Sequence, residues 1–576
     1  MENELRQIGG RKQLGYVLSR SRSDYAYFQP LKEMEALIKE GMFVVIISRN
    51  EGLTYLAEIT GISHYNEYYE KGEIWAEALR EGFPPPDEIS RRYTVAALRI
   101  LGVLTPQGLR NPDKPPLPGD LVYPASLNDL QSLYHYDLSS GQKPARFIEI
   151  GKIYGYESEE LKLPALLDTN NINMHFAVIG TTGSGKSNTM GRIIEMLGAR
   201  SGIDLPGGYK TIPVMIVDAN GDYLDYFENP ELVKSYSKVK RLYFEGSEAD
   251  NIRSQSSKAE LKRIKIDLNA LSPSEISETI IAIYHSGKLE GAELQLNYLS
   301  SFLSDIERLK EQFPLCMSNN NYEVDYNCII NKIDKLKELI EEDRKANKVH
   351  SSTADAVIRA VANFHELMVK KRNIIPPHGA NAEINDDFVD DITNPKDPKL
   401  VILDFSTEGA TGVDLTVKQF VVGNVLALLF KKFTAYRIQG VNRLLLFVIE
   451  EAQNYAPNTQ VYPIGFSLAK KILASVATQG RKFGLCLGLV TQRPSYVDPI
   501  VMSMMNTFII HRVAPGDIKF VSTVTGGLPK YIERRLTYME PGLAVLTGQM
   551  NVFPYPIFVK VDRREKHKYS SIVNNE

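Results

Sequence analysis

The spacing of apolar residues divides the chain into regions of different character. Up to about residue 155, short runs of β-branched and aromatic residues alternate with stretches rich in Gly and Pro. Such runs are typical of short strands, and they occupy 41–46, 54–63, 92–104 and 119–126. The run 92–104 is also compatible with a helix. The pattern predicts a small β-barrel over residues 1–155, with a sandwich as the alternative.

From about residue 172 the apolar runs become almost continuous, as expected of parallel strands that are buried on both faces. Helical segments lie between several of these runs. Together they predict a doubly wound α/β sheet. The runs cover 174–180, 213–219, 399–405, 443–450, 483–492 and 506–512.

A long stretch between the strand-like runs has a helical pattern. It opens with Ser272-Pro273-Ser274-Glu275, a capping box with proline in the first turn. Helical periodicity follows at 298–313 and 329–348. We predict a helical subdomain inserted in the sheet domain over 272–375. Its charged helix faces are better explained as solvated surfaces than as a surface for DNA.

A chain of 576 residues is too long for one ordinary core and should form two or more domains. Its 67 Lys and Arg residues balance 70 Asp and Glu residues, which gives a formal charge of -3. This balance excludes a generally basic protein that coats nucleic acid. Any contact with nucleic acid must therefore use a local patch or a pore.

The three cysteines, Cys316, Cys328 and Cys486, are too few for a disulfide framework, and their spacing does not suit zinc. Residues 1–4 are polar, and no apolar signal segment follows them. The longest strongly apolar runs, 420–430 and 444–449, are shorter than the ~18 residues of a membrane span. We therefore expect a cytoplasmic protein in a reducing compartment, with no membrane contact.

The strongest motif directly follows the first continuous apolar run. Glycines there would let backbone N–H groups point at phosphate oxygens, and the next helix would add the positive potential of its N-terminus. This strand–loop–helix context is required of a phosphate-binding G-x-x-x-x-G-K-[ST] motif. We predict a site for ATP and Mg²⁺; the alternative is a glycine-rich turn with an exposed lysine. The residues are Gly180, Thr181, Thr182, Gly183, Ser184, Gly185, Lys186 and Ser187, followed by Asn188.

Two residues of the loop have distinct predicted roles: Lys186 contacts the β- and γ-phosphates, and the Ser187 hydroxyl binds Mg²⁺. Hydrolysis also needs an acid in the metal shell and a group that orients water. The run 443–450 leads into Glu450-Glu451, and carboxylates at the end of a buried strand are costly unless they meet a cation or water. We assign Glu450 to the Mg²⁺ shell and Glu451 to the attacking water. The alternative is an exposed acidic strand end.

Two further polar residues lie at strand ends. Gln492 closes the run 483–492, where its amide could bind both the γ-phosphate and the water, or could simply precede a loop. Asp218 closes another strand. It could join the outer shell of the metal or cap the turn at 219–222, and the sequence leaves both interpretations open.

Arg481 is a candidate arginine finger just before the strand that ends at Gln492. A guanidinium is the best group to neutralise the charge that develops on a transferred phosphoryl. Because Arg481 should lie at the opposite edge of the sheet from the phosphate loop, we expect it to act in trans on a neighbouring subunit. The alternative is a surface arginine, and Lys482 is a weaker candidate for the same role.

Together, the segments 175–189, 218–223, 444–457 and 480–495 resemble the HerA branch of the HerA/FtsK ATPases. In that family Glu-Glu stands at the Walker B strand, a polar sensor closes the next strand, and an arginine precedes it. These features match the residues assigned above, and 541–561 is similar to the closing hairpin of the family. The segment 218–223 departs from the family pattern, and so does Gln453, which stands where a histidine often occurs.

The resemblance implies a RecA-like P-loop ATPase core with a small N-terminal β-barrel and a helical insertion. The core would carry Walker A in its first part and Walker B in its second part. The corresponding bounds are 1–155 for the barrel, 156–271 and 376–576 for the two parts of the core, and 272–375 for the insertion.

The resemblance also implies a homohexamer with double-stranded DNA in its central pore and a partner nuclease or sirtuin-like effector. The first hypothesis is an ATP-hydrolysing motor that translocates on or unwinds DNA, in repair or in antiphage defence. The alternative is an ATP-binding ring scaffold that assembles and regulates an effector enzyme. Protein unfolding or secretion is a third possibility. The loop 406–412 is a candidate for the pore lining.

Overall fold

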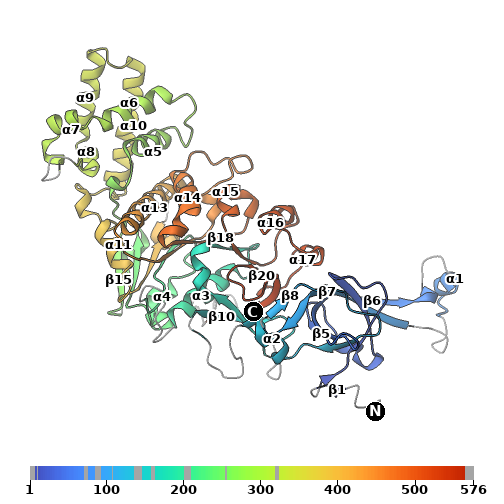
Figure 1. The fold of residues 1–576 in the computed structure, drawn as a ribbon. Helices are drawn as coiled ribbons and strands as arrows, with labels where there is room; N and C mark the ends of the chain where they lie inside the picture. The colour runs from blue at the N-terminus through green and yellow to red at the C-terminus, as the bar shows by residue number, and fades with distance from the viewer. Residues whose placement is uncertain are drawn as a thin grey trace. The chain divides into compact units, whose positions relative to one another are not determined.

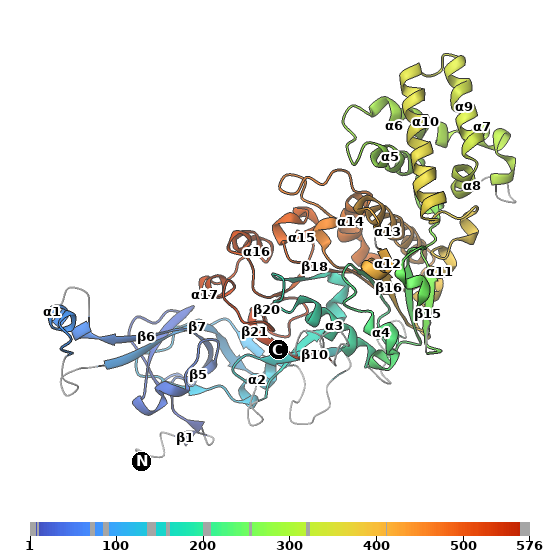
Figure 2. The same ribbon diagram turned by 180° about the vertical axis from the view of Figure 1, so that it is seen from behind.

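The computed structural model divides by its internal contacts into two units. The first comprises 1–167, 528–535 and 543–561, and the second comprises 168–527, 536–542 and 562–576. Figure 1 shows the ribbon from one side and Figure 2 from behind. The structure describes residues 7–8, 11–69, 75–84, 92–106, 108–134, 144, 146–156, 162–199, 209–252, 256–317, 323–410 and 412–564.

The first unit contains a closed β-barrel. Its strands follow the order β4-β3-β9-β5-β6-β7, and β7 pairs back with β4. The strands β5, β6 and β7 are labelled in Figure 1. Along β7, buried positions alternate with more exposed ones, as the pleat requires. The predicted barrel is confirmed, and 92–104 is part of a strand. The bounds are β3 Gly15–Val17, β4 Tyr25–Pro30, β5 Phe43–Ile47, β6 Thr54–Asn66, β7 Arg92–Thr105 and β9 Leu121–Pro124, with β8 Gly108–Arg110 beside β7.

Segments distant in sequence complete this unit. β10 Phe147–Ile153 pairs with β21 Ile557–Val561, which also pairs with β20 Leu543–Gly548, and both pairings are antiparallel. The predicted hairpin within 541–561 is therefore present, and it is hydrogen-bonded to a strand from the N-terminal part of the chain. The remaining strands and α-helices are β1 Gln7–Ile8, β2 Arg11–Lys12, β11 Pro164–Asp168, α1 Trp75–Arg80, α2 Leu127–Tyr134 and α17 Lys530–Arg535.

The second unit is centred on parallel strands in the order β19-β12-β18-β17-β13-β16-β14-β15. Every pairing between these neighbours is parallel. Each continuous apolar run of the sequence forms one of the strands, so the α/β class is confirmed. The bounds are β12 Phe176–Ile179, β13 Val214–Asp218, β14 Lys238–Tyr243, β15 Ala259–Arg263, β16 Lys399–Asp404, β17 Leu445–Ile449, β18 Leu485–Thr491 and β19 Thr507–Ile510.

The strands β14 and β15 are not apparent in the apolar pattern, because β14 carries charged residues. Arg241 of β14 is nevertheless only 1% exposed. Its Nε and Nη2 donate to Asp404 Oδ2 at 2.9 and 2.6 Å, and Nη2 also donates to Glu408 at 2.9 Å. Pairing with hydrogen bonds makes burial of this charge tolerable.

Helices connect the strands. α3 Lys186–Gly198 follows β12, and α13 Leu415–Ile438 packs on α14 Leu468–Gln479. α13 is buried over most of its length. Among the described residues, no helix has the length and apolar character needed to cross a membrane. Shorter helices are α4 Asp225–Glu228, α11 Asp386–Ile392, α12 Thr407–Ala410, α15 Pro499–Ser503 and α16 Ile518–Val524.

The predicted helical stretch forms a group in which α10 packs against α5, α6 and α9 (Figure 2). The capping box is present, with reciprocal hydrogen bonds between Ser272 and Glu275. The predicted helix 298–313 is broken at Asp305, whose side chain caps α7 instead. The bounds are α5 Pro273–Tyr284, α6 Glu293–Ser304, α7 Ile306–Gln312, α8 Tyr326–Asn331, α9 Ile333–Lys345 and α10 Ser351–His365.

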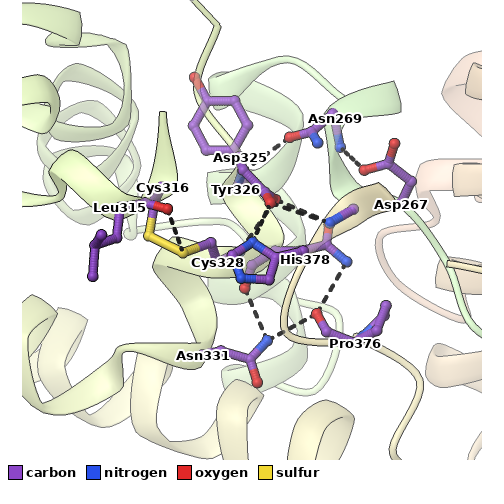
Figure 3. A network of polar contacts seen from close by, with 12 residues as sticks. Asp267, Asn269, Leu315, Cys316, Asp325, Tyr326, Cys328, Asn331, Pro376 and His378 are labelled. Atoms are coloured by element: carbon purple, nitrogen blue, oxygen red, sulfur yellow. Dashed lines mark hydrogen bonds and ion pairs between the residues drawn. A yellow bond between two sulfur atoms is a disulfide. The ribbon is translucent and has the colours of Figure 1, made fainter. Parts of the chain in front are cut away.

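Two of the three cysteines are paired, which corrects the expectation of reduced cysteines. A disulfide joins Cys316, after α7, to Cys328 in α8 (Figure 3). Asp325 caps α8, and its other carboxylate oxygen lies 3.0 Å from Nδ1 of His378. The pairing could not be predicted because the chain between α7 and α8 has no regular periodicity that would bring the two thiols together.

Loss of this disulfide should loosen α7 and α8 and leave the parallel sheet unchanged. A cross-link that closes a loop of this length stabilises a fold by about 3 kcal/mol. A variant with Cys316→Ser and Cys328→Ser should therefore show faster amide exchange in these helices, measured by mass spectrometry. Cys486→Ala, outside the pair, is the matched control. Equal exchange in the double variant and the wild-type protein would contradict the prediction.

Candidate nucleotide-binding site

The predicted phosphate loop lies between β12 and α3. Its backbone is left-handed at Gly183, with φ of 72°, and at Gly185, with φ of 114°. Residues with side chains rarely adopt this conformation, so the curl of the loop depends on these glycines. Because α3 begins at Lys186, its positive N-terminal end faces the loop.

A cavity of about 370 Å³ lies against this loop. One side is formed by the loop and the first residues of α3, and the other side by the ends of neighbouring strands. Residues that the sequence places more than 250 positions apart therefore surround one space. The lining residues are Thr182, Gly183, Gly185, Lys186, Ser187, Asn188, Asn220, Asp222, Glu450, Glu451 and Val490.

Three predicted loop residues, Gly180, Thr181 and Ser184, shape the loop rather than line this cavity. The hydroxyl of Ser184 is buried and donates to the Thr181 carbonyl at 2.7 Å. A side chain at Gly180 would collide with this hydroxyl, since an added Cβ would lie 2.5 Å from it. Together these contacts fix the start of the loop.

Lys186 brings positive charge to the cavity. Its ammonium donates to the Thr181 carbonyl at 3.1 Å. Burial lowers the pKa of Lys186, while Glu451, Glu450 and Asp222 act in the opposite direction. The ammonium therefore lies close enough to these carboxylates for an electrostatic interaction with them.

Glu450 directly follows β17 and is only 2% exposed. Its Oε1 accepts a hydrogen bond from the Tyr223 hydroxyl at 2.7 Å, whereas Oε2 is buried without a hydrogen-bond partner. Burial raises the pKa of Glu450 well above its usual range, and Asp218 and Asp222 raise it further. A divalent cation would stabilise such a carboxylate.

The cavity therefore fits Mg²⁺ held by Ser187 and Glu450. Mg²⁺ is usually bound by one or two protein groups, with phosphates and water as its other ligands. Within the described residues there is no cluster of three or more His, Cys, Asp or Glu side chains that could hold a metal alone.

Glu451 has a left-handed backbone, with φ of 49° and ψ of 48°. This conformation costs a residue other than glycine about 1–3 kcal/mol, and such strain is concentrated at functional sites. The Glu451 carboxylate accepts a hydrogen bond from Gln453 Nε2, and Gln453 Oε1 accepts one from Thr491 at 2.7 Å. Gln453, the departure from the family pattern, thus ties Glu451 to the end of β18.

Gln492 directly follows β18 and contacts the phosphate loop. The hydroxyl of Thr182 donates to Gln492 Oε1 at 2.7 Å. The amide that we assigned as a sensor is therefore in direct contact with the loop that would hold the phosphates.

Asp218, at the end of β13, caps the turn that follows it. Its Oδ1 accepts hydrogen bonds from the N–H groups of Asn220, Gly221 and Asp222 at 3.2, 2.8 and 3.0 Å, and its Oδ2 accepts one from Tyr223 at 2.9 Å. Of the two interpretations left open by the sequence, the structure displays the turn cap.

Arg481 lies far from the nucleotide cavity within the same chain. It precedes β18, whose other end leads into Gln492, and a strand of this length spans roughly 20 Å. Arg481 and Lys482 line a different cavity of about 380 Å³, together with Arg437 and Arg443. The structure does not bring Arg481 to the phosphate loop of its own chain.

Sequence reasoning missed Tyr223 and Arg564, both of which lie behind the cavity. Tyr223 belongs to the segment 218–223, so its closeness to the site could have been noticed. Arg564 lies in the tail and carries no pattern. Asn188, predicted to bind nucleotide, lines the cavity, and its amide also contacts the tail backbone: Nδ2 donates to the Asp562 carbonyl at 2.9 Å, and Oδ1 accepts from Arg564 N–H at 3.0 Å.

Comparison with known proteins gives a consistent result. Residues 148–429 match the family model described as the central domain of helicase HerA. The chain is 26% identical over 480 residues to the DNA double-strand break repair helicase HerA of Sulfurisphaera tokodaii, covering 82% of this chain and 79% of that protein. It is 25% identical to the protein of the same name from Saccharolobus solfataricus, covering 82% and 78%.

Among solved structures, that of VirB4 from Thermoanaerobacter pseudethanolicus is similar, with a TM-score of 0.47 and 14% identity. The match covers 74% of this chain and 98% of VirB4.

The glycine loop, the helix that follows it and the acidic strand ends around one cavity define a P-loop ATPase. The match to the HerA central domain over residues 148–429 and the curated relatives support a HerA-type ATPase, an enzyme that hydrolyses ATP.

In the protein without nucleotide, the charge of Glu450 should reduce stability. Because its pKa is raised in the folded state, the stability gained from its protonation is present at low pH and is lost as the pH rises through the folded value. Glu450→Gln keeps the shape and removes the charge. It should raise Tm by a few degrees at about pH 8 and by less at about pH 5.

Thermal unfolding of metal-free protein measures this effect. Glu290→Gln, an exposed carboxylate, is the control that should leave Tm unchanged at both pH values. A lower Tm for Glu450→Gln than for the wild-type protein at the higher pH would contradict the account of a buried, unsatisfied charge.

Proposed function

We propose that this HerA-type ATPase is a hexameric ring motor, with RecA-like cores, that uses ATP to translocate on or unwind double-stranded DNA. The relatives named above are DNA double-strand break repair helicases. The observation that carries the proposal is the division of the site: one cavity is lined by residues that we assign to phosphate binding and water orientation, while Arg481 lies at the other end of β18. A head-to-tail ring completes such a site with a neighbour's residue.

Within the cavity, the backbone of 180–187 and the Lys186 ammonium hold the phosphates. Ser187 and Glu450 would hold Mg²⁺, which would supply positive charge against the phosphates. Glu451 orients the attacking water and accepts its proton. The hydrogen bond from Gln453, whose own amide oxygen accepts one from Thr491, holds the Glu451 carboxylate in place before ATP arrives and so lowers the cost of reorganisation.

In this proposal Gln492 senses whether the γ-phosphate is present, and Arg481 supplies positive charge to the site of the adjacent subunit. Because Gln492 already contacts Thr182, loss of the γ-phosphate would change the partners of its amide. The guanidinium of Arg481 from the adjacent subunit stabilises the charge that develops on the transferred phosphoryl. Hydrolysis is thereby linked to the contact between neighbours.

DNA contact has to be local, since the net charge is -3. We propose that loop 406–412 lies in the pore; its residue 411 is outside the described residues. The base of this loop is braced by the ion pairs of Arg241 with Asp404 and Glu408. An added Cβ at Gly221 would lie 3.3 Å from the Ser406 side chain, so the turn behind the cavity packs against the loop.

In this proposal the ring works in the cytoplasm with a partner nuclease or another effector enzyme. The scaffold alternative, in which the ring regulates a nuclease or a sirtuin-like NAD hydrolase, differs in one observable. A motor responds to DNA itself, whereas a scaffold responds to its protein partner.

Two inactive variants test whether Arg481 acts in trans. Glu451→Gln should bind ATP and lose turnover by roughly 100-fold or more, and Arg481→Ala should also be inactive. In an equal mixture that reassembles into rings, about a quarter of the sites combine an intact Glu451 with a neighbour's intact Arg481. The ATPase rate of the mixture should rise above that of either variant. A mixture as inactive as its components, despite proven subunit exchange, would contradict a trans finger.

Double-stranded DNA should raise the ATPase rate of the assembled ring. The apparent affinity for DNA should fall as salt is raised, because phosphate contacts release counterions. ATP turnover with a duplex of fixed length, titrated at several salt concentrations, measures both effects. No response to duplex, together with strong activation by a partner protein, would instead favour the scaffold.

A further inference from the structure

We propose that Arg564 is a positioning residue for ATP hydrolysis, which acts by fixing Tyr223 and, through the Tyr223 hydroxyl, the Glu450 carboxylate. The inference rests on the proposed role of Glu450 in holding Mg²⁺. Arg564 itself does not line the nucleotide cavity.

The guanidinium of Arg564 is held on several sides. Nη2 donates to both carboxylate oxygens of Asp225, at 2.9 and 2.8 Å, and Nη1 donates to the Asp222 carbonyl at 3.0 Å. Nε lies 3.6 Å from Glu195 of α3. The residue is only 7% exposed. The tail is therefore anchored both to α3 and to the turn behind the cavity.

The same guanidinium stacks on two tyrosine rings. Its Cζ lies 4.8 Å from the ring centre of Tyr226 and 5.5 Å from that of Tyr223. A planar cation above an aromatic face is attractive and limits the rotation of the ring. The Tyr226 hydroxyl donates to the Gly191 carbonyl of α3 at 3.0 Å. Tyr223 is consequently fixed between the tail and the strand end that carries Glu450.

A glycine in the phosphate-loop helix makes room for this arrangement. An added Cβ at Gly191 would lie 2.3 Å from Cδ, 2.4 Å from Nε and 2.6 Å from Cζ of Arg564. No side chain fits there while the guanidinium keeps its position. Gly within a helix costs roughly 1 kcal/mol of stability relative to Ala. At position 191 this loss of helix stability is the consequence of leaving space for the Arg564 side chain.

The hydroxyl of Tyr223 connects Arg564 to Glu450, the residue that we assign to Mg²⁺. It donates the one hydrogen bond that the Glu450 side chain receives among the described residues, at 2.7 Å, and this bond leaves Oε2 available. Groups that orient a metal ligand typically influence metal affinity or activity by 10–100-fold. Arg564 thus controls which way the Glu450 carboxylate points, from a position outside the cavity.

The test uses the full-length protein with ATP and compares Arg564→Gln and Tyr223→Phe with Arg563→Gln, an exposed neighbour. The first readout is a Mg²⁺ titration of the ATP-bound protein, followed by thermal shift. Both variants should need roughly 10–100-fold more Mg²⁺ for half of the shift. The kcat should fall by a similar factor while KM for ATP stays within about twofold. Arg563→Gln should behave as the wild-type protein.

A double variant separates positioning from a general structural role. If Arg564 acts through Tyr223, combining Arg564→Gln with Tyr223→Phe should cost no more in Mg²⁺ requirement than the larger single effect. Additive effects, or an unchanged Mg²⁺ midpoint in Arg564→Gln, would overturn the inference. Should Arg564→Gln fail to fold, Arg564→Lys, which keeps the charge but loses the planar fork, takes its place with the same expected shift.

Glu450→Gln distinguishes the two proposals. A normal Mg²⁺ midpoint in Glu450→Gln would refute the assignment of Glu450 to the metal, and the role of Arg564 would fall with it. A large shift in Glu450→Gln together with none in Arg564→Gln would refute the positioning role alone.

Discussion

The chemistry of the nucleotide cavity in the second unit is set by a carboxylate that is buried without a neutralising partner. Glu450 ends a fully buried strand, one of its oxygens has no hydrogen-bond partner, and acidic neighbours raise its pKa further. Lys186 stands across the cavity but belongs to the loop shaped for phosphates. A ligand that contains both a divalent cation and a polyanion would neutralise the Glu450 carboxylate with its cation and the Lys186 ammonium with its anion. Buried charges need such close partners of opposite sign. Mg²⁺-bound ATP has this composition.

The order of the strands explains why the site assembles. β17 lies between β13 and β18, so Glu450 and Glu451 emerge between the turn capped by Asp218 and the residue Gln492. In parallel sheets, ligands bind at the carboxyl ends of the strands. Because Arg481 precedes β18, it lies at the amino ends of the strands, on the opposite side of the sheet from the cavity. One topological fact therefore accounts both for the clustering of four groups and for the separation of the fifth.

Much of this could be predicted from sequence, because the relevant signals are local. Continuous apolar runs become buried parallel strands, and the glycine loop needs only its own residues to be recognised. β14 could not be predicted because a charged residue such as Arg241 normally indicates an exposed position. Only the tertiary structure shows that Asp404, far along the chain, pairs with it. The disulfide and the contacts of Arg564 are equally non-local. Glu451 shows the intermediate case: its position was predictable, but its left-handed backbone and its link through Gln453 to Thr491 depend on tertiary structure.

The most direct measurement is an experimental structure of the assembled protein with a non-hydrolysable ATP analogue and Mg²⁺. We expect a metal beside Glu450 Oε2 and the Ser187 hydroxyl, phosphates within the loop 180–187, and the guanidinium of Arg481 from a neighbouring subunit directed at the γ-phosphate. Nucleotide bound elsewhere, or a metal that Glu450 does not approach while the phosphates occupy the loop, would contradict this expectation.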